Sequence, residues 1–113
     1  MDPADKSLVW LKGEVKTPPF TRSGRAEVGM LLRRLQRGHR LPMPQSRPMP
    51  SIGRGCHELR VRDEAQYWRV LYRLDSDVVL VIEVFAKSTR ATPDHVIAAA
   101  KRRLALYDSA RLG

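Results

Sequence analysis

The segment from Cys56 to Phe85 most constrains the fold, because it holds three strand-like stretches joined by short polar turns. In order, these stretches are CHELRVR (56–62), YWRVLYRLD (67–75) and VVLVIEVF (78–85). In the first two, side chains alternate between a largely apolar face and a face that carries charge, which is typical of strands with one buried side. The third is almost entirely apolar, so we expect protein to cover both of its faces. Three successive strands with short turns predict an antiparallel meander.

A short strand and a helix are predicted before the meander. Residues 7–11 (SLVWL) are apolar and partly β-branched, which favours a strand. Between Thr21 and Arg37, apolar residues recur at helical spacing, and Gly38 follows as a C-terminal cap. The apolar stripe of this helix consists of Val28, Leu31, Leu32 and Leu35.

A second helix is predicted after the meander. Thr92 is a good N-cap, Pro93 suits the first helical position, and apolar residues recur at helical spacing up to about Asp108. Between the first helix and the meander, residues 38–55 contain four of the eight prolines and show no period of 2 or 3.6. We expect this segment to cross the core as a loop in polyproline geometry.

These elements predict an α+β fold. A twisted antiparallel sheet, made of the short N-terminal strand and the three-stranded meander, is packed with an N-terminal helical segment and a C-terminal helix. A chain of 113 residues with 42% hydrophobic content has material for one core. We therefore expect a single domain over residues 1–113, with its core at about 7–108.

The charge balance favours a polyanionic partner. Lys and Arg number 21 against 12 Asp and Glu, which gives a formal net charge of +9 and a pI of about 10.6. Such a chain neutralises phosphates well, although a basic surface that only keeps the protein soluble is the alternative. No apolar run approaches the roughly 20 residues of a membrane span, and the N-terminus lacks a signal-peptide core. We expect a soluble cytoplasmic protein without membrane contact.

Neither a cofactor nor a metal is expected. Cys56 is the single cysteine, so no intramolecular disulfide can form, and no Cys/His group has metal-ligand spacing. The sequence also lacks a nucleophile elbow, a P-loop and an HExxH motif, and its histidines are too scattered for a two-histidine ribonuclease site. The usual enzyme motifs are therefore absent.

What remains is a group of cations on the meander. Because alternate residues share a strand face and antiparallel neighbours lie side by side, these cations can converge; they are Arg60, Arg62, Arg69, Lys87 and Arg90. Fixed guanidinium groups suit phosphodiester cleavage, in which negative charge builds on the phosphoryl oxygens. Like charge nearby is expected to lower the pKa of Lys87 and make it a general base. The alternative for each arginine is an ion pair or a simple phosphate contact.

Several motifs resemble the RelE/ParE superfamily of type II toxin-antitoxin toxins, in its HigB-like, phage-derived branch. The resemblance runs from about Val9 to Asp108, and its most specific parts are HELRVRD, WRVLY and VFAKSTRATP. It implies a RelE-like fold and a metal-independent endoribonuclease that cleaves mRNA in the ribosomal A site and inhibits translation. It also implies a cognate antitoxin from an adjacent gene, often a helix-turn-helix protein, so that the toxin is a monomer or part of a toxin-antitoxin hetero-oligomer.

The resemblance also implies roles for individual residues. The matching catalytic positions are Arg60, Arg62, Arg69 and Lys87, with Arg69 at the transition-state position of the WRVLY strand. Residues assigned to RNA binding are Arg90, Arg73, Glu58 and His57. Among these, Glu58 shares the arginine face and can orient Arg60 or Arg69, whereas His57 also suits the core or its rim.

One departure from the family pattern leaves two other functions open. Ser88 and Ala91 stand where this branch usually has lysines, which removes two charges from the loop after the last strand. A ParE-like toxin that inhibits DNA gyrase without cutting RNA is one alternative. A decayed toxin that only binds nucleic acid is the other.

Overall fold

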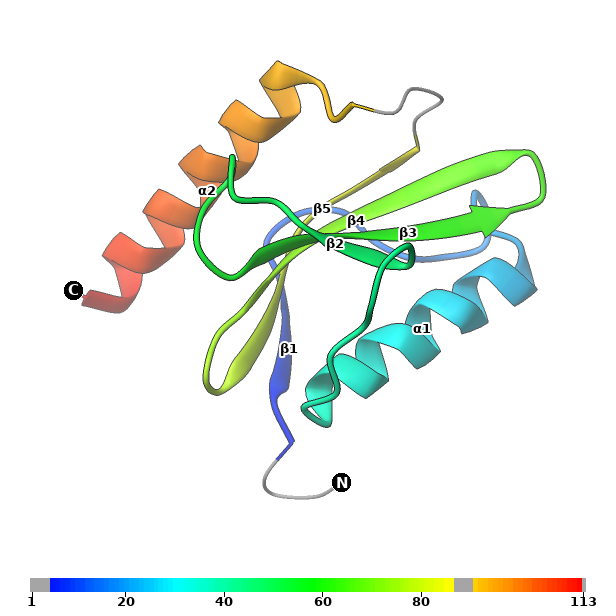
Figure 1. The fold of residues 1–113 in the computed structure, drawn as a ribbon, viewed down its shortest axis with the longest axis horizontal. Helices are drawn as coiled ribbons and strands as arrows, with labels where there is room; N and C mark the ends of the chain where they lie inside the picture. The colour runs from blue at the N-terminus through cyan, green and yellow to red at the C-terminus, as the bar shows by residue number, and fades with distance from the viewer. Residues whose placement is uncertain (1–4, 87–90, 113) are drawn as a thin grey trace.

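The computed structural model describes residues 5–86 and 91–112, and over these residues the chain forms one five-stranded sheet between two helices (Figure 1). In chain order, the elements are β1 (Ser7–Trp10), α1 (Arg22–Gln36), β2 (Ser46–Pro48), β3 (Cys56–Asp63), β4 (Gln66–Leu74), β5 (Val78–Ala86) and α2 (Asp94–Leu112). The strand order across the sheet is β1-β5-β4-β3-β2. The predicted α+β class and the β3-β4-β5 meander are confirmed.

The sheet differs from the prediction at both of its edges. β1 pairs with β5 in the parallel direction, so the sheet is mixed rather than wholly antiparallel. At the other edge, Ser46–Pro48 forms the short strand β2 antiparallel to β3, where a polyproline crossing was expected. The β1-β5 pairing joins residues 71 positions apart and the β2-β3 pairing residues 9 to 13 apart, and in both cases alternation within a strand does not encode its partner or direction.

The two faces of the sheet carry separate hydrophobic layers. The α1 side buries the predicted helix stripe against apolar residues of the strands, among them Leu59, Val61, Val70, Val79 and Val81. The α2 side buries Ala100 and Leu104 of the helix against Leu71, Leu80 and Ile82. Apolar side chains of β5 contribute to both layers, as its sequence predicts. Alternation therefore assigns the side chains of β3 and β4 to their faces, whereas in β5 a register shift after Val81 interrupts it, so that Ile82 and Val84 pack in opposite layers.

The observed ends of α1 agree with those predicted from the sequence, whereas both ends of α2 differ from the prediction. Thr21 caps α1 by accepting a hydrogen bond from the Gly24 N–H at 3.0 Å, and Gly38, with φ of +89°, follows the last turn. In α2 the carbonyl of Pro93 accepts the first bonds, from the N–H groups of Val96 and Ile97. The helix thus begins at Asp94 rather than at the predicted Pro93, and it continues past Asp108 to Leu112.

A close contact ties the start of α1 to the end of β3. The buried Asp63 carboxylate accepts hydrogen bonds from the N–H of Thr21, at 2.9 Å, and from its hydroxyl. These hydrogen bonds lower the pKa of Asp63 below its usual range. The contact leaves no room beside the helix, because a Cβ placed on Gly24 would lie 2.3 Å from the Asp63 carboxyl carbon.

The two glycines of α1 should respond oppositely to alanine. Gly29 has open space around it, so Gly29→Ala is expected to raise the free energy of unfolding by about 0.5–1 kcal/mol through helix propensity. Gly24→Ala forces its methyl group against Asp63 and is expected to lower that free energy by about 1–3 kcal/mol. Chemical denaturation followed by circular dichroism measures both. Equal stabilisation by the two substitutions would contradict the close contact.

Candidate nucleic-acid interface

An arginine cluster lies on the sheet face that α2 partly covers. Arg60 of β3 is directly opposite Arg69 of β4 in the strand register, and Arg47 of β2 is opposite Glu58 of β3. Because side chains two residues apart on a strand share a face, Glu58 and Arg60 point to the same side. We use the name arginine cluster for Arg47, Arg60 and Arg69 together with Glu58.

Glu58 lies at the centre of this cluster. Its side chain is fully buried, and its Oε1 lies 3.2 Å from Nε of Arg47 and 3.4 Å from Nε of Arg69. The Thr92 hydroxyl, from the segment just before α2, donates to Oε2 at 2.5 Å. Glu58 therefore links β2, β4 and the entrance to α2, and it holds two guanidinium groups in place.

Arg69 is the most buried cation of the cluster. Its side chain is 7% exposed, compared with 32% for Arg47, and its Nη1 donates to the Trp68 carbonyl at 3.3 Å. The Arg69 Nε is within ion-pair distance of Glu58 but is not aligned for a hydrogen bond. Burial lowers the pKa of Arg69; the Glu58 carboxylate opposes this shift, and the like charges of Arg60 and Arg47 add to it. Arg69 is thus held below the surface beside the Glu58 carboxylate, with the charges of Arg60 and Arg47 nearby.

The remaining predicted site residues occupy three places. Arg62 lies one row beyond Arg60 on the same face, opposite Tyr67, and is exposed. His57 lies on the other face of β3, where its ring stacks on Tyr72 with 5.3 Å between centroids and its Nδ1 lies 3.1 Å from the Gly55 carbonyl oxygen. Lys87 and Arg90 lie outside the described residues. The structure therefore brings Arg60, Arg62, Arg69 and Glu58 to one face and separates His57 from them.

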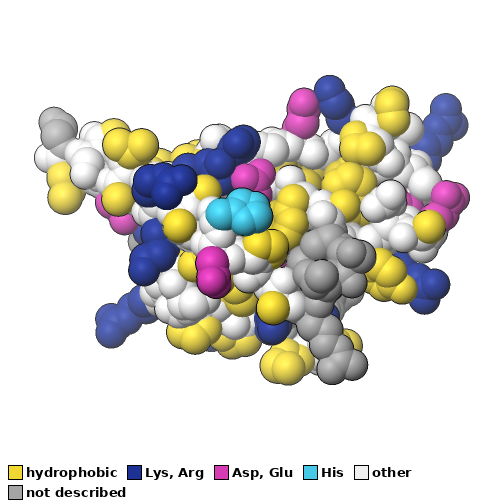
Figure 2. Space-filling model, turned by 90° about the horizontal axis from the view of Figure 1, so that it is seen from above, with side chains coloured by type: hydrophobic (Ala, Val, Ile, Leu, Met, Phe, Trp, Pro, Cys, Tyr) yellow, Lys and Arg dark blue, Asp and Glu magenta, His cyan; other side chains and the backbone are white. Residues whose placement is uncertain are grey.

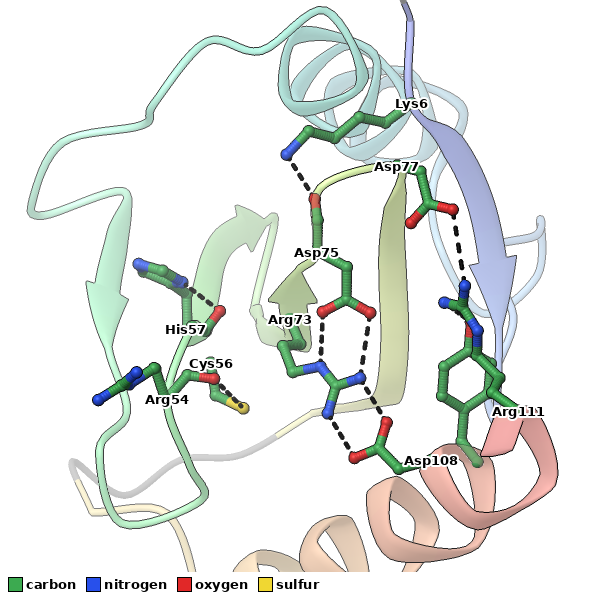
Figure 3. Close-up of polar contacts among 11 residues, drawn as sticks. Lys6, Arg54, Cys56, His57, Arg73, Asp75, Asp77, Asp108 and Arg111 are labelled. Carbon is green, nitrogen blue, oxygen red and sulfur yellow. Dashed lines mark hydrogen bonds and ion pairs between the residues drawn. The ribbon is translucent and has the colours of Figure 1, made fainter. Parts of the chain in front are cut away.

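Arg73 lies at the far end of β4, where it binds carboxylates (Figure 3). Its Nε and Nη2 contact the Asp75 carboxylate at 2.8 and 3.0 Å, and its Nη1 and Nη2 contact Asp108 of α2 at 3.0 and 2.8 Å. These bonds raise the pKa of Arg73 and lower that of Asp108. Arg73 thus fastens α2 to β4 rather than joining the arginine cluster. Two surface hollows, of about 280 and 460 Å³, lie at this same end.

Arg47 is the cluster residue that the sequence analysis missed. It lies in the proline-rich segment, which has neither strand nor helix periodicity, so nothing marked its direction. One local signal was present, because a residue that precedes proline is restricted to extended backbone, and Arg47 precedes Pro48. The pairing of this extended residue with Glu58, eleven positions later, has no such signal.

Basic side chains are spread around the molecule as well as in the cluster. Figure 2 shows Lys and Arg side chains around the outline of one face, interleaved with apolar ones. Among the described residues, no group of three or more His, Cys, Asp or Glu side chains has a metal-binding arrangement. Neither helix is long and apolar enough, over the part of the chain that is described, to cross a membrane.

Fold and site together define a small basic α+β protein with guanidinium groups gathered on one sheet face. The family model described as "Phage derived protein Gp49-like (DUF891)" matches residues 19–105, about three quarters of the chain. The chain belongs to this Gp49-like family, which is a RelE/ParE-like toxin family associated with toxin-antitoxin systems. A search of curated proteins finds no match.

Proposed function

We propose that this protein is the toxin of a type II toxin-antitoxin system, in the HigB-like branch, and that it cleaves mRNA on the ribosome. One observation carries the proposal: Arg47 and Arg69 flank the single carboxylate of Glu58, and Arg60 lies opposite Arg69 in the strand register, so the cluster has excess positive charge on its sheet face. Membership in a RelE/ParE-like toxin family supports the toxin class. Inhibition of translation follows from loss of intact mRNA.

The proposed reaction is transesterification within the RNA backbone, without a metal. The ribose 2′-oxygen forms a bond to the adjacent phosphorus while the bond to the 5′-oxygen breaks. A general base takes the 2′-hydroxyl proton, and the departing 5′-oxygen gains a proton, so the products end in a 2′,3′-cyclic phosphate and a 5′-hydroxyl. Negative charge that builds on the phosphoryl oxygens is stabilised by guanidinium groups fixed beforehand.

The solvent exposure of each cationic side chain suggests its role in the proposed reaction. Arg60 and Arg47 are partly exposed, so we assign them direct contact with the phosphate. Arg69 is held beneath by Glu58, and we assign it a fixed positive field under the same phosphate. We assign Arg62 to an adjoining part of the RNA backbone. Lys87 remains the proposed general base on sequence grounds.

The proposed partners follow from this activity. The substrate is mRNA held in the ribosomal A site, and the inhibitor is an antitoxin encoded by the adjacent gene, with a helix-turn-helix as the expected fold. The +9 net charge supports a polyanionic partner such as ribosome-bound mRNA. A short helix-turn-helix reading frame beside this gene would support the antitoxin assignment.

Induced expression tests the proposal. We expect growth arrest, new mRNA ends carrying 5′-hydroxyl groups in primer extension, and rescue by co-expression of the adjacent antitoxin gene. Growth arrest without new mRNA ends, but with altered plasmid supercoiling, would contradict cleavage and favour a gyrase-inhibiting toxin. Normal growth at a verified protein level would favour a decayed toxin that only binds nucleic acid.

A further inference from the structure

An exposed tyrosine lies one row beyond the arginine cluster. Tyr67 is near the start of β4 and is 45% exposed, although its neighbour Trp68 is 8% exposed and stacks on Phe20 with 4.0 Å between ring centroids. The two adjacent aromatic residues therefore differ in their environment. Trp68 belongs to the core on the α1 side, whereas much of the Tyr67 ring is open to solvent.

The register places Tyr67 on the same face as the cluster. Tyr67 pairs with Arg62, and the next row toward the centre of the sheet pairs Arg69 with Arg60. Rows two residues apart on a strand are separated by about 6.8 Å. In Figure 1, the β3-β4 hairpin extends beyond the end of the sheet that α2 covers.

Arg62 adds a cation beside the ring. Its Cζ lies 5.6 Å from the Tyr67 ring centroid, which is a cation-π distance. A ring and a guanidinium group next to fixed phosphate-binding cations are the combination that proteins use to hold unpaired nucleotides, with aromatic stacking for the base and positive charge for the backbone.

We propose that Tyr67, with Arg62 beside it, is a stacking subsite for an unpaired nucleobase of the RNA. The base belongs to a nucleotide next to the phosphate held by Arg60 and Arg47, so the inference rests on the proposed function and extends it to substrate binding. Every nucleobase has a π-face, so the subsite accepts all four bases and contributes affinity and position more than sequence preference.

A fluorescent base measures this stacking directly. The probe is a single-stranded RNA with one 2-aminopurine and with 2′-deoxy sugars at the linkages around it, which prevents cleavage; it is used free and in the A site of programmed ribosomes. We expect quenching of 2-aminopurine by the native protein and by Tyr67→Phe. Tyr67→Leu should lose the quenching and bind about 5- to 150-fold more weakly, as expected for one base-aromatic stack.

A matched control and the contrary outcomes complete the test. Trp10 is 40% exposed on the edge strand β1, which β5 separates from β4, so Trp10→Leu should leave quenching and affinity unchanged. Quenching by Tyr67→Leu equal to that of the native protein would overturn the subsite, even if mRNA cleavage is intact. Quenching that depends on Tyr67 without mRNA cleavage would keep the subsite and reject the nuclease. Failure of the native protein to bind either probe form would overturn the subsite.

Discussion

Replacing Glu58 with alanine is expected to remove about 3–5 kcal/mol from the free energy of unfolding. Glu58 is fully buried, and its loss leaves the nearly buried Arg69 guanidinium without the carboxylate beside it. An uncompensated buried charge is among the most destabilising changes in a protein interior. Equilibrium unfolding in urea, followed by circular dichroism, measures the loss. The lost ion pair with Arg47 should contribute less to this loss of unfolding free energy, because the Arg47 side chain is 32% exposed and can turn toward water.

Two variants separate this effect from a general loss of charge. Glu14 forms a surface ion pair with Lys16, with side chains 70% and 61% exposed, so Glu14→Ala should change the unfolding free energy by less than about 1 kcal/mol. In the double variant Glu58→Met with Arg69→Met, both charges are gone and much of the lost stability should return. A Glu58→Ala effect no larger than that of Glu14→Ala would show that the central ion pair is not needed for the fold.

Replacing Arg60 with alanine is expected to slow mRNA cleavage by about 10²- to 10³-fold, the usual cost of removing one donor that stabilises transition-state charge. Arg60 is only partly buried, and its like charge lowers the pKa of Arg69, so its removal relieves repulsion within the cluster. The variant should therefore fold as stably as the native protein. Cleavage rates on programmed ribosomes, measured together with unfolding curves, test both statements.

The control for Arg60 removes the same charge elsewhere. Arg102 is exposed on α2, and Arg102→Ala should leave the cleavage rate close to the native one. If Arg60→Ala cleaves as fast as Arg102→Ala, the cluster does not act on the reacting phosphate. Arg69→Ala is a weaker test, since it also deprives the buried Glu58 of a partner and confounds lost activity with lost stability.

The alternation of side chains correctly predicted which face of the sheet each residue of β3 and β4 occupies, but it did not predict how deeply each side chain is buried. It placed Glu58, Arg60 and Arg69 on one side of the meander and Val70 on the other, as the structure confirms. Alternation has a period of two and contains no measure of how far a side chain is covered. That Arg69 is buried beneath its neighbours follows from packing of β2, β4 and the segment before α2, which no single strand encodes.

Contacts between different segments of the chain were the second feature that the sequence did not predict. The sequence did not predict that Arg47 would reach Glu58, or that Arg73 would bind Asp108, thirty-five residues away. The parallel direction of β1 was missed for the same reason, because its paired residues in β5 lie 71 positions later. In each case local pattern identified the element or the charge, and the tertiary fold selected the partner.

The short edge strand β2 has a consequence for how a chain can approach the cluster. The Arg60 N–H donates to the Gln45 carbonyl and the Met49 N–H donates to the Cys56 carbonyl, so these β2-side backbone groups face β3. The backbone nitrogen atoms of Ser46 and Pro48 therefore lie on the outward side of the strand. The Ser46 N–H already bonds to the Pro42 carbonyl at 3.1 Å, and Pro48 has no N–H. This strand therefore gives an incoming β-strand no backbone donor to pair with. Beside the arginine cluster, the edge strand thus offers no backbone N–H group to an anionic ligand, which must be bound there by side-chain donors.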